Sequence, residues 1–275
     1  MNILYQEDLI NKTIKYDTFN EFPKSNLFIG DEGCGKSLLT SYISNMVLRV
    51  PCKDITNSIT NELIMDLYTS SLACIYKIDI SELAAVKRYL NVENSILKLI
   101  EEPPSNAVIV IHADSRNQVL DTIYNRCIKW IFKPYTTEQL KYFANLNELD
   151  IDDVTISTMM RTPGDVIKGL SKDEYAILFD VCNNIIDNIH RANLSNTLTL
   201  TKHVKFKEDS SGYELSVFFR AMLRCLIQRL TTNCYNSEYE RFFKVTKKSI
   251  EESYILNINK EHLFNKYILE LKYGH

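Results

Sequence analysis

The feature that most constrains the fold is a glycine-rich loop between a short apolar run and a helical pattern. The segment "NLFIGDEGCGKSLLTSYI", residues 26–43, fits the spacing G-x-x-x-x-G-K-S with Gly30, Gly35, Lys36 and Ser37. Glycines let backbone N–H groups wrap a phosphate, the lysine supplies positive charge, and the serine hydroxyl binds Mg²⁺. The helix start adds a favourable dipole. The segment therefore predicts a nucleotide-binding loop between a strand and a helix.

The sequence pattern of the rest of the chain predicts alternating strands and helices, followed by helices alone. Short β-branched or aromatic runs predict strands at 26–30, 73–80, 106–113 and 127–132, and helical patterns occupy 36–50, 94–102 and 115–126. After Pro134 nearly every segment has helical periodicity, with a Thr-Pro-Gly break at 162–164. We expect an α/β domain with a parallel sheet, then a small helical domain, then an all-helical end. The predicted boundaries are 1–134, 135–171 and 172–275.

Composition narrows the class of protein. The 275 residues carry a formal net charge of -3, which argues against a chain that coats nucleic acid by itself, because such binding needs an excess of basic residues. We find neither a signal-peptide pattern nor an apolar run near the roughly 20 residues of a membrane span, so we expect a soluble, cytoplasmic protein. The seven cysteines form no CxxC pair and predict reduced thiols, not zinc ligands. Abundant Asn, Ile, Lys and Tyr fit an AT-rich genome, such as that of a bacteriophage or a low-GC bacterium.

A second informative segment is residues 94–132, "NSILKLIEEPPSNAVIVIHADSRNQVLDTIYNRCIKWIF". It resembles clamp loader subunits of the AAA+ class, especially the delta-prime subunit of DNA polymerase III. That family has an Asn-Ala-Leu-Leu-Lys helix, then Glu-Glu-Pro-Pro, a strand, and a helix ending in Ser-Arg-Cys. Here the order is Asn94 to Lys98, Glu101 to Pro104, a strand, and Asn125 to Cys127. The lid segment 161–170 and the end of the chain are also similar, and residues 50–93 match least well.

The resemblance implies an AAA+ P-loop sheet domain, a helical lid domain and a helical collar domain, and it assigns roles. The residues expected to cradle ATP are Gly30, Gly33, Cys34, Gly35, Lys36, Ser37 and Leu38. Ser37 and Asp79 would bind Mg²⁺. Arg126 would be an arginine finger that reaches the nucleotide of a neighbouring subunit. The partners implied are other clamp loader subunits, a sliding clamp and primer-template DNA, with Lys87, Arg88 and Arg116 as candidate phosphate contacts.

Three departures from the family pattern concern hydrolysis. The glutamate that should follow the metal-binding aspartate, and act as general base, is replaced by Ile80 after Asp79. The sensor-one position falls on Ala113, and Asp114 or His112 would reach it only with a shift of the chain. The lid arginine position falls on Gly164, with Arg161 out of register.

These departures predict a subunit that binds ATP with little or no hydrolysis and acts on a neighbour through Arg126. Two alternatives stay open. One is an active loader ATPase that completes its site with Asp79 and Glu82. The other is an AAA+ scaffold of a different replication or packaging machine.

Overall fold

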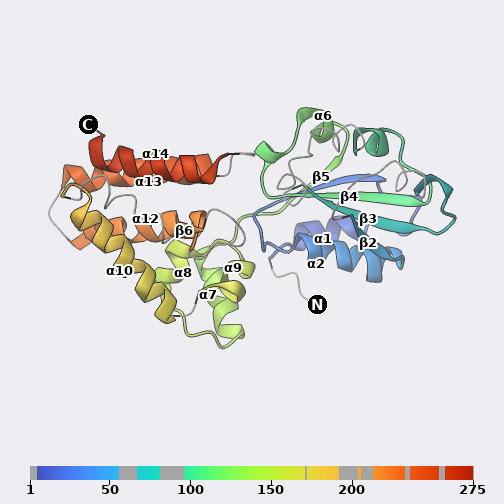
Figure 1. The fold of residues 1–275 in the computed structure, drawn as a ribbon. Coiled ribbons are helices and arrows are strands. Elements are labelled where there is room, and N and C mark those ends of the chain that lie inside the picture. The colour runs from blue at the N-terminus through green and yellow to red at the C-terminus, as the bar shows by residue number, and fades with distance from the viewer. Residues whose placement is uncertain are drawn as a thin grey trace. The chain divides into compact units, whose positions relative to one another are not determined.

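The protein is represented by a computed structural model that describes residues 5–55, 67–80, 96–170, 172–191, 204–205, 213–232, 236–253 and 258–274 (Figure 1). The chain divides into two compact units. The first comprises Met1–Gln139 and Thr162–Gly164, and the second Leu140–Arg161 and Asp165–His275. The division into three domains stays a prediction.

The first unit is built on a five-stranded parallel sheet with strand order β2-β3-β4-β1-β5 (Figure 1). Its strands are β1 (Ser25–Ile29), β2 (Cys52–Ile55), β3 (Cys74–Asp79), β4 (Ala107–Ala113) and β5 (Ile128–Ile131). Every residue of β1 and β4 is buried. Parallel strands covered on both faces are apolar throughout, which is why the sequence runs predicted four of these strands correctly. The predicted α/β parallel sheet is therefore confirmed.

The strand β2 was not predicted, and its exposure explains why. It lies at one edge of the sheet, and its first three residues are exposed, so "CKDI" carries no apolar run. An edge strand pairs on one side only and needs less apolar surface than an internal strand.

Helices cover both faces of this sheet. Helices α1 (Glu7–Thr13) and α2 (Lys36–Tyr42) lie on one face and the short α6 (Asp121–Tyr124) on the other (Figure 1). A single-turn π-helix, Ile43–Leu48, continues α2, and residues 96–101 are helical. The helix predicted over 36–50 is thus confirmed, with a widened second half.

The helix predicted over 115–126 is wrong as a continuous element. The structure has a 3₁₀ turn at Arg116–Gln118, extended backbone at Val119 and Leu120, and only then α6. The guanidinium of Arg116 donates to the Val119 carbonyl at 2.5 Å and pairs with Asp121, so it spans the break. The side chain of Arg116 therefore stabilises the extended backbone between the turn and α6.

The aromatic core of the first unit lies on the α1 and α2 face. The ring of Trp130 is 5.9 Å from that of Phe22 and 5.6 Å from that of Phe28, and all three residues are fully buried. Aromatic pairs at these centroid distances contribute beyond their buried area. The same buried cluster includes Leu9 of α1 and Leu39 of α2, so it joins both helices to the sheet.

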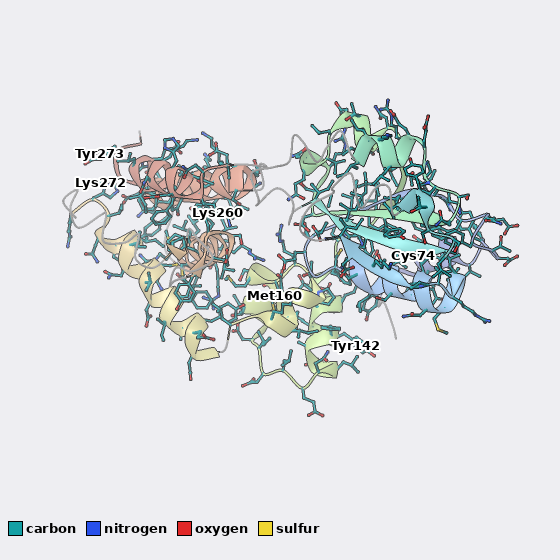
Figure 2. The ribbon with its side chains drawn as sticks, turned by 45° about the vertical axis from the view of Figure 1, so that its right-hand side comes forward. Cys74, Tyr142, Met160, Lys260, Lys272 and Tyr273 are labelled. Carbon is teal, nitrogen blue, oxygen red and sulfur yellow. The ribbon has the colours of Figure 1, made fainter. Side chains whose placement is uncertain are left out.

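The second unit is helical in its larger part. Its helices are α7 (Thr137–Leu146, which begins in the first unit), α8 (Asp153–Met159), α9 (Pro163–Lys168), α10 (Lys172–Asn188), α12 (Leu215–Thr232), α13 (Ser237–Ser253) and α14 (Lys260–Tyr273). Figure 2 labels Lys260 at the start of α14 and Tyr273 at its end. Helix α12 packs against α8, α10 and α13, and α14 packs against α13. The helical end predicted from the sequence is confirmed.

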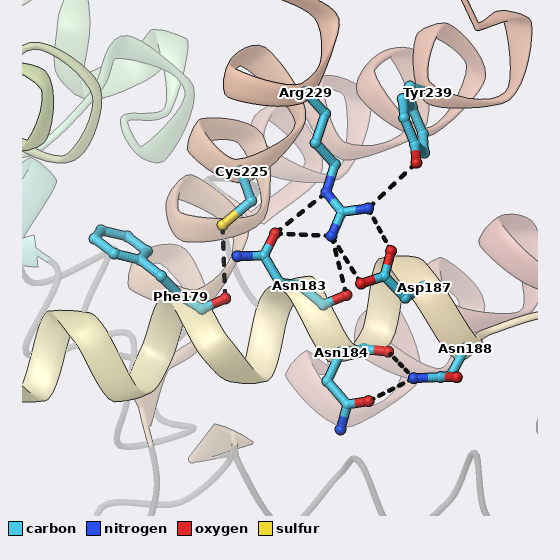
Figure 3. A network of polar contacts seen from close by, with 8 residues as sticks. All are labelled: Phe179, Asn183, Asn184, Asp187, Asn188, Cys225, Arg229 and Tyr239. Atoms are coloured by element: carbon cyan, nitrogen blue, oxygen red, sulfur yellow. Dashed lines mark hydrogen bonds and ion pairs between the residues drawn. The ribbon is translucent and has the colours of Figure 1, made fainter. Parts of the chain in front are cut away.

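Two features of this unit were not predicted. Val204–Lys205 (β6) and Tyr213–Glu214 (β7) pair as a small parallel sheet. A partly exposed polar network joins three helices: Arg229 of α12 donates to the side-chain oxygen of Asn183 at 3.2 Å and to the Tyr239 hydroxyl at 3.2 Å, and it pairs with Asp187 (Figure 3). The Arg229 guanidinium lowers the pKa of Asp187. The loop expected at 207–212 lies outside the described residues.

Three properties of the described residues concern membranes, metal ions and cysteines. None of the described helices is both long and apolar enough to cross a membrane. The described residues hold no group of three His, Cys, Asp or Glu side chains that could bind a metal ion. The six described cysteines are free, and all are buried except Cys52.

Candidate nucleotide-binding site

The candidate site lies at the carboxyl ends of β1 and β4, which are neighbours in the sheet. The connection after β1 leads toward β2 and the connection after β4 leads to β5, on opposite sides. Ligands of open parallel sheets bind in the crevice at such a point, where the connections diverge. The amide of Gly30 donates to the carbonyl of Ala113 at 3.2 Å, which ties the loop after β1 to the end of β4.

The loop backbone has the conformation that phosphate binding requires. Gly33 and Gly35 have φ angles of +78° and +106°, in the left-handed region that favours glycine. The amides of Lys36 and Ser37 lie in the first turn of α2, where no intrahelical carbonyl can accept them. Such free donors and the helix dipole attract an anion. A Cβ at Gly30 would lie 2.6 Å from the Phe132 Cβ, so that position also needs glycine.

Lys36 is buried and fully hydrogen-bonded. Its ammonium donates to the carbonyls of Gly30 at 2.5 Å and Asp31 at 3.2 Å, and to the carboxylate of Asp114 at 2.9 Å. An ammonium has three donors, so these contacts use all of them. The side chain of Lys36 is 8% exposed and that of Asp114 is 27% exposed, so the ion pair is partly shielded from water.

Asp114 is the site residue that sequence reasoning missed. We expected it to reach the sensor position only with a shift of the chain, yet its carboxylate contacts the loop lysine directly. Its backbone amide donates to the side chain of Gln118 at 2.8 Å, which turns the chain after β4. Lys36 and Asp114 are 78 positions apart in the sequence, which explains the miss, because the adjacency of β1 and β4 brings them together.

The other predicted loop residues have different surroundings. Ser37 and Leu38 are exposed, so the Ser37 hydroxyl is open to a metal ion. The thiol of Cys34 is buried, and burial raises its pKa to about 11. Cys34 therefore contributes through its backbone, and its carbonyl accepts a hydrogen bond from the Tyr135 hydroxyl at 3.0 Å. The residues present thus fit the phosphates of a nucleotide and a hard cation.

A second chain segment of the first unit packs directly on the loop. The amide of Gly164 donates to the Gly33 carbonyl at 3.1 Å, and the Thr162 hydroxyl donates to the Glu32 carbonyl at 2.8 Å. A Cβ at Gly164 would lie 2.4 Å from the Gly33 Cα. Gly164, expected only as the place of a lost arginine, is therefore required by backbone packing. Two loop carbonyls, those of Glu32 and Gly33, are thus occupied as acceptors by this segment.

The end of β3 carries Asp79 and Ile80. Asp79 pairs in register with His112 of β4, at the same edge of the sheet as the loop, and Ile80 is fully buried. An apolar, buried side chain cannot activate water. Glu82, the alternative base, lies outside the described residues.

His112 is a buried neutral ring beside the loop helix. Its Nε2 lies 2.9 Å from the Thr40 hydroxyl, and its ring stacks on Phe28. Burial, then the positive charges of Lys36 and Lys77, lower the pKa of His112 to about 3. The ring is therefore uncharged at neutral pH.

Arg126 follows α6 and is partly exposed. Its Nε lies 2.6 Å from the Glu101 carboxylate, its Nη1 donates to the Thr122 carbonyl at 2.9 Å, and its side chain is 42% exposed. The Glu-Glu-Pro-Pro motif and the predicted finger are therefore in direct contact. Cys127, the next residue, is buried, and burial raises its pKa to about 12.

Of the three basic residues that we expected to contact DNA, the structure describes only Arg116. Lys87 and Arg88 lie outside the described residues, as does Asn94 of the helix motif. Arg116 pairs with Asp121 and stacks on the ring of Tyr124 at 4.0 Å, so its charge is already matched locally.

Comparison with known proteins gives a family match over part of the chain. Residues 53–136 match the family described as "DNA polymerase III, delta subunit". The match includes Asp79, Glu101 and Arg126, and it begins within the segment we expected to match least well. The match does not include the loop at 30–38, so the interpretation of that loop as a nucleotide-binding loop depends on its conformation and contacts. No curated protein matches the chain.

Three solved structures illustrate the proteins to which this chain is similar. A DNA polymerase III gamma subunit-related protein of Thermotoga maritima is 13% identical, covers 97% of this chain and 98% of its own, and has a TM-score of 0.48. The RuvB Holliday junction branch migration motor of the same organism is 16% identical, with coverages of 96% and 87% and a TM-score of 0.47. The clamp loader delta protein of Bacillus subtilis is 11% identical, with coverages of 96% and 98% and a TM-score of 0.36.

The parallel sheet, the loop after its first strand and the helical region that follows make this an AAA+-like fold. The predicted resemblance is confirmed by the family match: over residues 53–136 the chain carries the sequence pattern of a DNA polymerase III delta-type clamp loader subunit.

Proposed function

We propose that this chain is a subunit of a sliding clamp loader that binds ATP, hydrolyses it weakly or not at all, and supplies Arg126 to the nucleotide site of a neighbouring ATPase subunit. Its partners would be other loader subunits, a sliding clamp and primer-template DNA.

One observation carries the proposal: the binding loop is complete while the position of the general base is apolar. Lys36, Gly33 and Gly35 have the conformations and charge that phosphates require. Ile80, which follows the metal candidate Asp79, is fully buried. General bases contribute about 10²–10⁴ in rate, so a site without one retains binding and loses most turnover.

The loop residues have separable tasks in this scheme. Backbone amides of Gly33 to Ser37 would hold the phosphates, and the ammonium of Lys36 would neutralise their outer charge. Ser37 and Asp79 would hold Mg²⁺, which supplies charge stabilisation to phosphoryl groups when bound. Ala113 offers no side-chain donor at the end of β4, so it cannot sense a terminal phosphate.

The position of Arg126 favours a role outside its own site. Its Glu101 partner is 47% exposed, and ion pairs between exposed side chains contribute about 0–1 kcal/mol. Exchange of Glu101 for a phosphate of another subunit is therefore inexpensive. In NTPases an arginine supplied in this way contributes about 10³–10⁵ in rate.

Steady-state ATP hydrolysis tests the proposal. We expect the purified chain, with clamp and primed DNA, to turn over ATP no faster than its Lys36→Ala variant. Calorimetric titration with ATP and Mg²⁺ should show binding by the wild type and its loss in the variant, because Lys36 is the only positively charged side chain in loop residues 30–38. Robust turnover that the variant lacks would favour the active-ATPase alternative. A pull-down with this chain should recover a ring-shaped clamp and partner ATPases. Recovery of neither would favour the scaffold alternative.

A further inference from the structure

All three N–H donors of the Lys36 ammonium already have acceptors in the structure. A phosphate can therefore bind Lys36 only if it replaces one of these acceptors. Two acceptors are carbonyls of the loop itself, Gly30 and Asp31, and they fix the position of the ammonium. The third is the carboxylate of Asp114, which is the only one of the three that carries charge. Exchange of one anion for another is the least disruptive way to free a donor.

We infer that Asp114 is a built-in competitor of nucleotide phosphates: it holds Lys36 as an internal counter-ion and lowers the affinity of the site until phosphate displaces it. This inference rests on the proposed nucleotide binding and adds a residue that sets its strength.

The location of Asp114 explains why it would weaken phosphate binding. Its carboxylate lies 2.9 Å from the atom that would contact the outer phosphates. After displacement, the carboxylate stays tethered at the end of β4, since the Asp114 amide bonds to Gln118 and the preceding Ala113 carbonyl bonds to Gly30. A negative charge therefore remains close to a bound polyphosphate. The pair is only partly exposed, so water screens that repulsion incompletely.

This arrangement also predicts a dependence on divalent cation. Free ATP brings more negative charge to Asp114 than Mg²⁺-bound ATP does, because the cation neutralises part of the phosphate charge. The inhibitory effect of Asp114 should therefore be largest without Mg²⁺.

The test compares ATP affinity of the full chain and three variants by calorimetry, with Mg²⁺ and with EDTA. Asp114→Asn keeps the size of the side chain and an acceptor for Lys36 but removes the charge. We expect it to bind ATP roughly tenfold more tightly than the wild type in EDTA, and about threefold more tightly with Mg²⁺. Lys36→Ala should abolish binding. Asp121→Asn is the matched control, because Asp121 pairs with Arg116 and not with Lys36; its affinity should equal that of the wild type.

The outcomes separate the two proposals. If the wild type binds ATP and Asp114→Asn binds equally or more weakly, Asp114 is not a competitor, while nucleotide binding stands. Weaker binding confined to the Mg²⁺ series would overturn the inference by identifying Asp114 as a metal ligand. If neither the wild type nor Asp114→Asn binds ATP, although circular dichroism shows both folded, the proposed nucleotide binding fails and this inference fails with it.

Discussion

At the scale of single residues, His112 shows how burial beside a cationic loop fixes a protonation state. Its ring is 1% exposed, stacks on Phe28, and shares a hydrogen bond with Thr40 of α2. Because burial and the lysine charges lower its pKa from 6.5 to about 3, the folded protein holds the neutral ring through most of the acidic range. Protonation of His112 is therefore linked to unfolding and not to nucleotide chemistry at neutral pH.

This linkage predicts the pH dependence of stability. Between pH 6.5 and about 3 the unfolded chain binds a proton at His112 that the folded chain does not. The free energy of unfolding should therefore fall as pH drops, by up to about 1.4 kcal/mol per pH unit from this site. His112→Gln, which cannot titrate, should show a shallower decline from pH 6.5 to 5. Urea unfolding followed by fluorescence of Trp130, the single tryptophan, reports on this unit.

His262 provides the control for that measurement. It is exposed near the start of α14, so His262→Gln should keep the wild-type pH profile. Equal slopes for the wild type and His112→Gln would show that the buried ring does not carry the effect.

At the scale of elements, the contact between the loop after β1 and the start of α9 determines what these segments can accommodate. Gly33 and Gly164 approach so closely that a methyl group on either would meet backbone of the other. The Gly164 amide and the Thr162 hydroxyl bond to consecutive loop carbonyls, at Gly33 and Glu32. The conformation of the loop therefore depends on a segment about 130 residues away in sequence.

Gly164→Ala should disturb this contact. Its Cβ would lie 2.4 Å from the Gly33 Cα, so one of the two backbones must move. Overpacking of this kind costs about 1–3 kcal/mol, and displacement of Gly33 should weaken ATP binding several-fold. Urea unfolding and ATP titration measure the two effects. Ile167→Ala is the control: Ile167 is 61% exposed on the same helix, and its loss should change stability by less than about 0.5 kcal/mol. Wild-type affinity and stability in Gly164→Ala would mean that the contact is not required.

The sequence predicts elements well where burial is continuous and poorly where it is not. The run "AVIVIHA" gives β4 directly, since an internal parallel strand is apolar on both faces. The exposed edge strand β2 has no such run, and the helix that periodicity predicts over 115–126 is interrupted by extended backbone at Val119 and Leu120. The loop was also evident from sequence, because its glycines, lysine and serine are local. Asp114 and the role of Gly164 were not, since both depend on strand order and long-range packing.

At the scale of the whole molecule, the proposed division of labour separates binding from catalysis. Lys36 and the loop would serve this chain's own nucleotide, and Arg126 would serve a neighbour's. The two residues bind different groups: Lys36 donates to carbonyls of the loop and to Asp114, while Arg126 bonds to Glu101 and Thr122. Variants at one position should therefore leave the task of the other intact.

Arg126→Ala tests this separation. The variant should bind ATP as the wild type does, yet reduce ATP hydrolysis by the reconstituted clamp loader by about 10³-fold or more at the site it serves. Arg126→Lys should restore little, because a lysine lacks the planar fork of a guanidinium. Glu101→Gln is the matched control, since it removes the partner of Arg126 and keeps the guanidinium. Unchanged hydrolysis in the complex with Arg126→Ala would refute the finger assignment.

The three hydrogen bonds of the Lys36 ammonium have a consequence for the stability of the protein without nucleotide. A lysine buried without partners would be costly, and a ligand that supplied an anion would then contribute to the stability of the fold. Here the chain's own carbonyls and one carboxylate satisfy that charge. The protein's own groups therefore offset the cost of burying this charge, and the first unit does not need a bound nucleotide for that purpose.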